Sequence, residues 1–172
     1  MTSSTGSDVA QNLLPPPPVE SCQFDFWLGD WDVCWGDGLR GENHVERIMN
    51  GHVVRETFDG MPGTALKGMS VSTFDVTVGA WRQTWVDNYG GYLDFTGGMS
   101  DGQMILSRSA LIDGRPVWQR MVWLNIGPDS LDWHWERSED GGLTWQIQWA
   151  LHYTRKKIRA GISARPVISQ LL

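Results

Sequence analysis

The feature of this chain that most constrains its fold is a long succession of short segments in which apolar and polar residues alternate. No segment has the sustained i, i+3, i+4, i+7 apolar spacing of an amphipathic helix, and helical residues are expected only in a short turn near Ser21–Trp27 and in the C-terminal tail. Gly, Asp and Asn residues separate the segments, which is typical of strands joined by tight turns. The expected strands cover residues 30–36, 42–49, 52–58, 65–74, 80–87, 91–97, 102–108, 115–125, 130–137 and 145–155.

Short connections between so many strands indicate an antiparallel meander, which twists and tends to curl. Closure on itself removes the exposed strand edges. The sequence therefore predicts an all-β fold, a single antiparallel up-and-down barrel of about ten strands, with a two-sheet sandwich as the alternative. Asn50-Gly51 is expected to form a two-residue type I′ hairpin turn, because both central positions of that turn need positive φ.

The 172 residues divide into three parts. Residues 1–20 are expected to form a flexible arm that ends in four consecutive prolines, residues 21–157 the barrel domain, and residues 158–172 a basic C-terminal extension. The arm has no basic or apolar stretch of a secretory signal, and Cys22 and Cys34 match no metal-binding pattern. A cytoplasmic protein with two reduced thiols is expected.

The charge and hydropathy exclude two classes of partner. The formal net charge of −6 argues against a nucleic-acid-binding surface. No apolar run approaches the roughly 20 residues needed to span a bilayer, so no membrane partner is expected. A homodimer remains open, because the arm or the basic extension could dock on a second copy of the chain.

The 11 tryptophans are the strongest compositional signal, and most of them follow strand alternation. The face opposite the Trp-rich face is polar and carries His134 and His152. Because a barrel in water places its polar face outward, the Trp-rich face should line the interior. In the 115–125 strand the set with Met121 and Trp123 is assigned inward. The residues expected to contact a ligand are Trp35, Trp81, Gln83, Trp85, Met121, Trp123, Trp133, Trp135, Trp149 and Tyr153.

These interior residues leave two uses of the barrel open, since bulky aromatic side chains can fill the barrel or can line a cavity. The first function hypothesis is a binding protein for a small hydrophobic, aromatic molecule. A filled barrel that acts as an interaction module is a further alternative.

A cofactor-free enzyme of secondary or aromatic metabolism that uses the same interior is the main rival hypothesis, with isomerase, cyclase or decarboxylase chemistry. Asp87 lies on the face of Trp81 and Trp85, where desolvation would raise its pKa and suit it to acid–base catalysis. Arg137 or Arg120, if its side chain points inward, could hold an anionic group or pair with Asp87. The competing interpretation of Asp87 is a turn residue that caps the hairpin before Asn88.

Motifs for cofactors and metals are not found in the sequence. It has no phosphate-binding glycine loop and no nucleophile elbow, and its four histidines have no metal-ligand spacing, so neither a cofactor nor a metal is expected. Some barrels of similar size bind haem through a histidine near the C-terminal strand; by this analogy His152 is the one candidate ligand, but its strand parity places it outside. Residues 138–145, Ser-Glu-Asp-Gly-Gly-Leu-Thr-Trp, match the Asp box of sialidase-type propellers; the single copy is interpreted as a hairpin turn and not as a sign of glycosidase activity.

Residues 24–33, Phe-Asp-Phe-Trp-Leu-Gly-Asp-Trp-Asp-Val, resemble the opening block of a large bacterial family of lipocalin-like proteins, most of unknown function. Weaker resemblances follow in order at residues 73–81, 85–87 and 97–102. The resemblance implies a calycin-type barrel. It also implies that Trp31 closes the base of the barrel and packs against an arginine late in the chain, for which Arg155 is the candidate.

Overall fold

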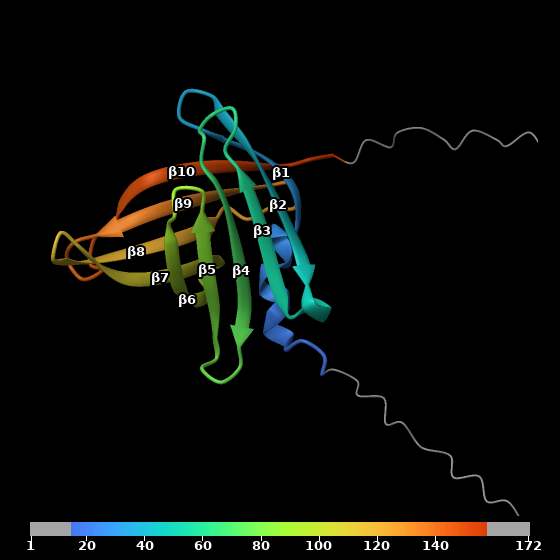
Figure 1. The fold of residues 1–172 in the computed structure, drawn as a ribbon. Coiled ribbons are helices and arrows are strands. Elements are labelled where there is room, and N and C mark those ends of the chain that lie inside the picture. Colours follow the sequence, from blue (N-terminus) through green and yellow to red (C-terminus); the bar gives the residue numbers. More distant parts are fainter. Residues whose placement is uncertain (1–14, 158–172) are drawn as a thin grey trace, which may run out of the picture.

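The computed structural model describes residues 15–157, which form a closed barrel of ten antiparallel strands (Figure 1). The predicted up-and-down barrel is therefore confirmed, and the two-sheet sandwich is excluded. Two short 3-10 segments accompany the strands: η1 (Val19–Trp27), which includes the expected helical turn, and η2 (Met49–Gly51). The strands are β1 (Gly29–Trp35), β2 (Leu39–Ile48), β3 (Val53–Asp59), β4 (Lys67–Asp75), β5 (Ala80–Asp87), β6 (Tyr92–Ser100), β7 (Gln103–Ile112), β8 (Arg115–Leu124), β9 (Ser130–Ser138) and β10 (Gln146–Arg155).

Each strand pairs with its neighbours in the sequence, and β1 pairs with β10 to close the barrel. Side chains therefore alternate between the interior and the outer face along every strand. In β1, Trp31 and Val33 are buried, whereas Asp30, Asp32 and Cys34, which alternate with them, are exposed. This alternation confirms the inward assignment of the Trp-rich faces.

The segment η1 closes one end of the barrel, which we call the base. Figure 1 shows η1 at the end of the barrel where β2 turns into β3. The Phe24 ring of η1 packs edge-on against Trp81 and Trp123, with ring centroids 4.7 and 5.4 Å apart, and Trp27 packs against Trp123 at 5.1 Å. These side chains are almost completely buried. Aromatic residues thus fill the lower part of the barrel, so this part has no room for a ligand.

Arg155 secures the seam between β1 and β10. It lies opposite Trp31 in the strand register, and its guanidinium carbon is 4.1 Å from the centroid of the Trp31 ring. The same guanidinium donates hydrogen bonds to the backbone carbonyls of Phe26, Leu28 and Pro128. The stacking that the family resemblance implied is therefore present, and the hydrogen bond to Phe26 ties η1 to β10.

The β2–β3 turn differs from the prediction. Ile48 pairs with Val53, so the connection has four residues, and Met49, Asn50 and Gly51 all have positive φ. The two-residue type I′ turn expected at Asn50-Gly51 is therefore wrong. Asn50 and Gly51 do have the predicted positive φ, but the connection is longer than the predicted two residues.

The ends of the chain are described only in part. Of the expected N-terminal arm, the carbonyl of Pro15 lies 2.9 Å from Nε2 of His52, and the ring of Pro17 lies next to Gly51. This end of the arm therefore lies against the β2–β3 turn. Residues 1–14 and the extension at 158–172 lie outside the described residues.

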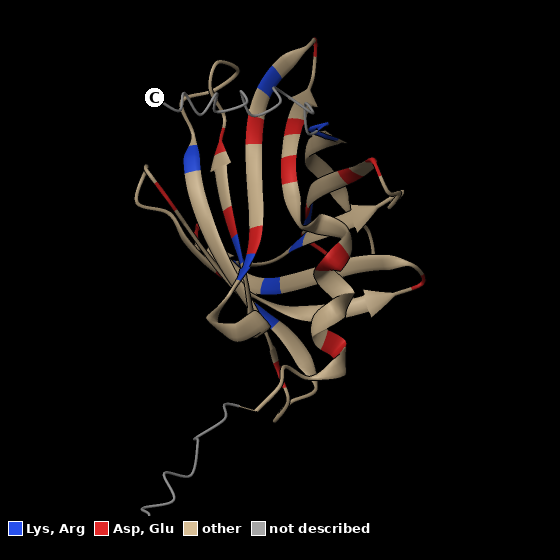
Figure 2. Cartoon of the chain, turned by 90° about the vertical axis from the view of Figure 1, so that its right-hand side faces the viewer, with Lys and Arg blue, Asp and Glu red and all other residues tan. Residues whose placement is uncertain are grey.

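Acidic positions are spread over η1 and several strands (Figure 2). On the outer face of β8 and β9, Arg120 donates a hydrogen bond to the buried carboxylate of Glu136 at 2.6 Å and stacks 4.0 Å from the Trp145 ring. Trp145 is the last residue of the predicted Asp box, in which Asp140 accepts hydrogen bonds from Leu143 and Thr144. The motif therefore forms the turn between β9 and β10, as expected. In residues 15–157 no helix is long and apolar enough to cross a membrane.

Candidate functional site

A cavity of about 320 Å³ occupies the barrel above the aromatic base. It lies between the level of Trp123 and the end of the barrel that carries the β5–β6 turn, which we call the open end. Most of its wall is apolar and aromatic. The lining residues are Glu56, Phe58, Leu66, Trp85, Asp87, Leu93, Phe95, Gln119, Met121, Trp123, Trp133, Trp135, Trp149, Leu151 and Tyr153.

The indoles of the wall support one another through edge-on contacts. Trp149 packs nearly perpendicular to Trp133 and to Phe58, with ring centroids 6.0 and 5.9 Å apart. Phe95 packs in the same way against Trp135 at 5.8 Å. Such pairs are more favourable than area burial alone predicts and hold the rings in defined orientations. The wall is therefore preformed.

Gly68 of β4 makes room for the indole of Trp85. A Cβ atom at residue 68 would lie only 2.0 Å from Cζ2 of Trp85, so the ring lies directly over the glycine. The Trp85 Nε1–H donates a hydrogen bond to the Asp87 carboxylate at 3.1 Å. Trp85 is thereby held flat along the wall of the cavity near its open end.

One carboxyl group, that of Glu56, lines the inner part of the cavity. Glu56 belongs to β3, and its side chain accepts hydrogen bonds from Nδ2 of Asn43 at 2.8 Å and from Oγ of Ser70 at 2.7 Å. Asn43 Nδ2 also lies 3.3 Å from the hydroxyl of Tyr153, which lines the cavity too. Asn43, Glu56, Ser70 and Tyr153 form what we call the polar cluster. Its members are all buried.

Burial dominates the electrostatics of this cluster. Desolvation raises the pKa of Glu56 to about 7, although the hydrogen bonds from Ser70 and Asn43 act in the opposite direction. Burial, together with the nearby Glu56 charge, also raises the pKa of Tyr153 well above its ordinary range, so this hydroxyl stays protonated. The cavity therefore contains a carboxyl group that changes its protonation near neutral pH.

The sequence analysis predicts a raised pKa for Asp87, and this prediction is wrong. Its carboxylate accepts hydrogen bonds from the backbone N–H groups of Gly91 and Tyr89, both at 2.9 Å, and from Trp85. These bonds, with that from Gly91 as the largest effect, lower the pKa of Asp87. Asp87 caps the β5–β6 turn at the open end of the cavity, as the competing interpretation held.

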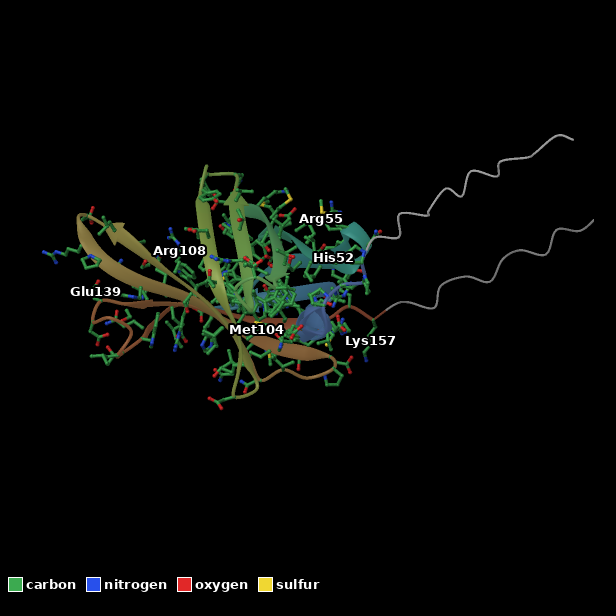
Figure 3. All side chains as sticks on the ribbon, turned by 90° about the horizontal axis from the view of Figure 1, so that it is seen from below. His52, Arg55, Met104, Arg108, Glu139 and Lys157 are labelled. Atoms are coloured by element: carbon green, nitrogen blue, oxygen red, sulfur yellow. The ribbon has the colours of Figure 1, made fainter. Side chains whose placement is uncertain are left out.

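Arg137 does not meet Asp87 in the cavity. It lies beyond the lining residues, where β7, β8 and β9 extend past the open end, and it pairs with Glu139 at 2.8 Å. Figure 3 shows Glu139 at the outer tip of these strands, well away from Met104 near the base. The expected pairing of Arg137 with Asp87 is therefore wrong, because equal strand parity does not bring the two to the same height in the barrel.

Seven of the ten residues expected to contact a ligand do line the cavity: Trp85, Met121, Trp123, Trp133, Trp135, Trp149 and Tyr153. The other three are outside it. Trp81 is buried in the base and donates a hydrogen bond to Gln23, and Gln83 donates one to Ser72 at 2.9 Å. Trp35 packs edge-on against the Trp149 indole, with centroids 5.4 Å apart.

Sequence analysis missed Glu56, Asn43 and Ser70. The signal that could have found Glu56 is the alternation in β3, where the buried residues are Val54, Glu56 and Phe58. A glutamate between two apolar residues of one face is a buried charge, and a buried charge needs polar partners from neighbouring strands. The strand parity of β2 and β4 then offers Asn43 and Ser70.

His152 lies on the outer face, with Nδ1 at 2.7 Å from the Asp132 carboxylate. His134 also points away from the lumen and lies 3.3 Å from Glu136. Both outward assignments are confirmed. Among residues 15–157, no group of three or more His, Cys, Asp or Glu side chains is placed to hold a metal ion.

Comparison with protein-family models and with curated proteins finds no match for this chain.

Proposed function

We propose that the protein binds a small hydrophobic, aromatic molecule inside the barrel. The observation that carries this proposal is the cavity of about 320 Å³, whose wall holds five indole rings. Ligand sites in proteins are typically concave, mostly apolar cavities that start at about 300 Å³ and contain a few polar groups that fix orientation. This cavity has both properties.

The construction of the barrel supports the proposal. A barrel whose only task was to be stable would gain from a filled interior, because empty volume lowers stability by roughly 24 cal/mol per Å³. Here aromatic side chains fill the base, whereas the wall above it is held open by edge-on ring contacts and by Gly68 beneath Trp85. A flat aromatic ligand would replace the missing contacts.

Titration with a neutral aromatic probe, 2-(1-naphthyl)ethanol, tests the proposal, followed by intrinsic Trp fluorescence and by calorimetry. We expect saturable quenching, because a ligand in the cavity lies against several indoles. Met121→Trp and Leu93→Trp fill the cavity and should abolish saturation. Met69→Trp is the matched control, since Met69 is exposed on the outer face of β4. A lack of saturable binding to the unaltered protein would overturn the proposal.

Cofactor-free acid–base chemistry is the second candidate, and one observation favours it. The Glu56 carboxyl lines the cavity, and burial raises its pKa to about 7, which is a suitable value for a general acid or base at neutral pH. Glu56 replaces Asp87 as the residue for this role. A substrate whose turnover is lost in Glu56→Gln, while its binding is kept, would establish the enzyme; unchanged turnover would exclude Glu56.

A further inference from the structure

The charged groups that line the cavity are both acidic. They are Glu56 in the polar cluster and Asp87 near the open end, and no Lys, Arg or His is among the described residues that line it. Two arginines on the inward faces of β7 and β9 have other partners. Arg108 donates a hydrogen bond to Gln119 at 2.8 Å, and Arg137 pairs with Glu139.

Hydrogen bonds satisfy the Glu56 carboxyl as an acceptor, but no cation in the described part of the chain neutralises its negative charge. Its two described donors, the Asn43 amide and the Ser70 hydroxyl, are both neutral. Tyr153, from β10, is the other titratable group beside it and stays protonated. A buried carboxylate without a cation is costly in an apolar environment, and a paired one is far less so.

A second buried acceptor lies in the same cluster. The Oδ1 atom of Asn43 has no hydrogen-bond partner among the described residues, although it is buried. Unsatisfied buried acceptors are rare in folded proteins and call for an explanation. The polar cluster thus contains a carboxyl group that lacks a cation and an amide oxygen that lacks a donor among residues 15–157, and of the two residues only Glu56 lines the cavity.

We propose that the cavity takes an organic amine, with the ammonium group at Glu56 and an aromatic body against the Trp-rich wall. This proposal rests on the ligand binding proposed above and adds the chemical class of the ligand. An ammonium group supplies the missing positive charge and up to three N–H donors. Indole faces also attract cations, most strongly where water is excluded. An anionic ligand would instead meet two carboxylates.

Binding of the amine includes a proton balance but no covalent step. Near neutral pH part of the empty protein carries Glu56 as the neutral acid. The ammonium group pairs with the carboxylate, so binding releases that proton to the solvent, while the amine keeps its own. With half-ionisation near pH 7, the ionised fraction, and therefore the amine affinity, rises about tenfold between pH 6 and pH 8.

Three probes with one aromatic body test the proposal by calorimetry: 2-(1-naphthyl)ethylamine, the neutral 2-(1-naphthyl)ethanol, and 1-naphthaleneacetate. At pH 8 we expect the amine to bind at least about tenfold more tightly than the alcohol, and the carboxylate most weakly. Only the amine affinity should rise with pH. In buffers of different ionisation enthalpy at pH 7, amine binding should release protons.

Glu56→Gln keeps the shape and removes the charge, so it should abolish the preference for the amine and leave the alcohol affinity near its original value. Glu42→Gln, which neutralises an exposed carboxylate on the outer face of β2, is the control and should change neither. The pH series on the unaltered protein gives an independent result if Glu56→Gln fails to fold. Equal affinities for amine and alcohol would overturn the amine proposal and leave the proposed function intact. A failure of all three probes to bind would overturn the proposed function itself.

Discussion

Glu56→Gln should change how the stability of the protein depends on pH. The pKa of Glu56 is about 7 in the folded barrel and 4.5 for the free side chain. The unfolded chain therefore releases this proton at lower pH than the folded chain does. The contribution of Glu56 to the stability is therefore fully present below its pKa in the unfolded chain, and it is lost as the pH rises through its pKa in the folded barrel.

The magnitude follows from the size of the shift. A rise from 4.5 to about 7 corresponds to about 3 kcal/mol of unfolding free energy. More than about 2 kcal/mol of this loss falls between about pH 5 and about pH 8. The Gln variant has no proton to release, so its stability should lack this loss. Relative to the unaltered protein, Glu56→Gln should thus gain stability as the pH rises.

Urea unfolding followed by Trp fluorescence at the two pH values measures this difference. The comparison between protein and variant cancels the contributions of all other titrating groups. Glu42→Gln serves as the control and should give the same offset at both pH values, because Glu42 is exposed. If the stability difference between the unaltered protein and Glu56→Gln is the same at both pH values, the burial of the Glu56 charge is refuted.

Three further outcomes are expected. Arg155→Ala should lower the unfolding free energy by about 3 kcal/mol, since it removes the stacking on Trp31 and three hydrogen bonds to carbonyls. In the same thermal or urea unfolding experiment, Arg155→Lys should restore less than half of the lost free energy. Gly68→Ala should lower the unfolding free energy by about 1–3 kcal/mol and weaken the binding of a neutral naphthyl probe, because the alanine Cβ would push the Trp85 indole into the cavity. An affinity equal to that of the unaltered protein would contradict this. Asp87→Asn should change the affinity for that neutral probe by less than about twofold in calorimetry, because Asp87 caps a turn, and a tenfold loss would show that the carboxylate holds the ligand.

The strand order and the inward face of nearly every strand could be predicted, because alternation with a period of two residues is a local property of the sequence. The assignment of Met121 and Trp123 to the interior shows this, although β8 carries large apolar residues on both faces. Alternation does not report the height of a residue along the barrel axis. That height depends on the stagger between strands and on how far η1 reaches into the base.

Differences in height along the barrel axis explain why some residues were wrongly predicted to line the site. Trp81 and Trp85 share one face of β5, yet Trp81 is buried under Phe24 of η1 while Trp85 lines the cavity. Arg137 is on the inward face of β9 but lies above the cavity. The pKa of Asp87 was misjudged for a related reason: its backbone donors come from the turn that follows it, and apolar neighbours alone do not determine a pKa.

The pairing of β1 with β10 has a consequence for the folding of the chain during its synthesis. Trp31 must find Arg155, so the barrel cannot close until nearly the whole described chain has left the ribosome. Until then β1 and the newest strand present unpaired backbone edges, which attract other chains. Pairing of such remote segments is intrinsically slow. Protection of nascent chains from aggregation is therefore most needed during the synthesis of β10, the last of the described strands.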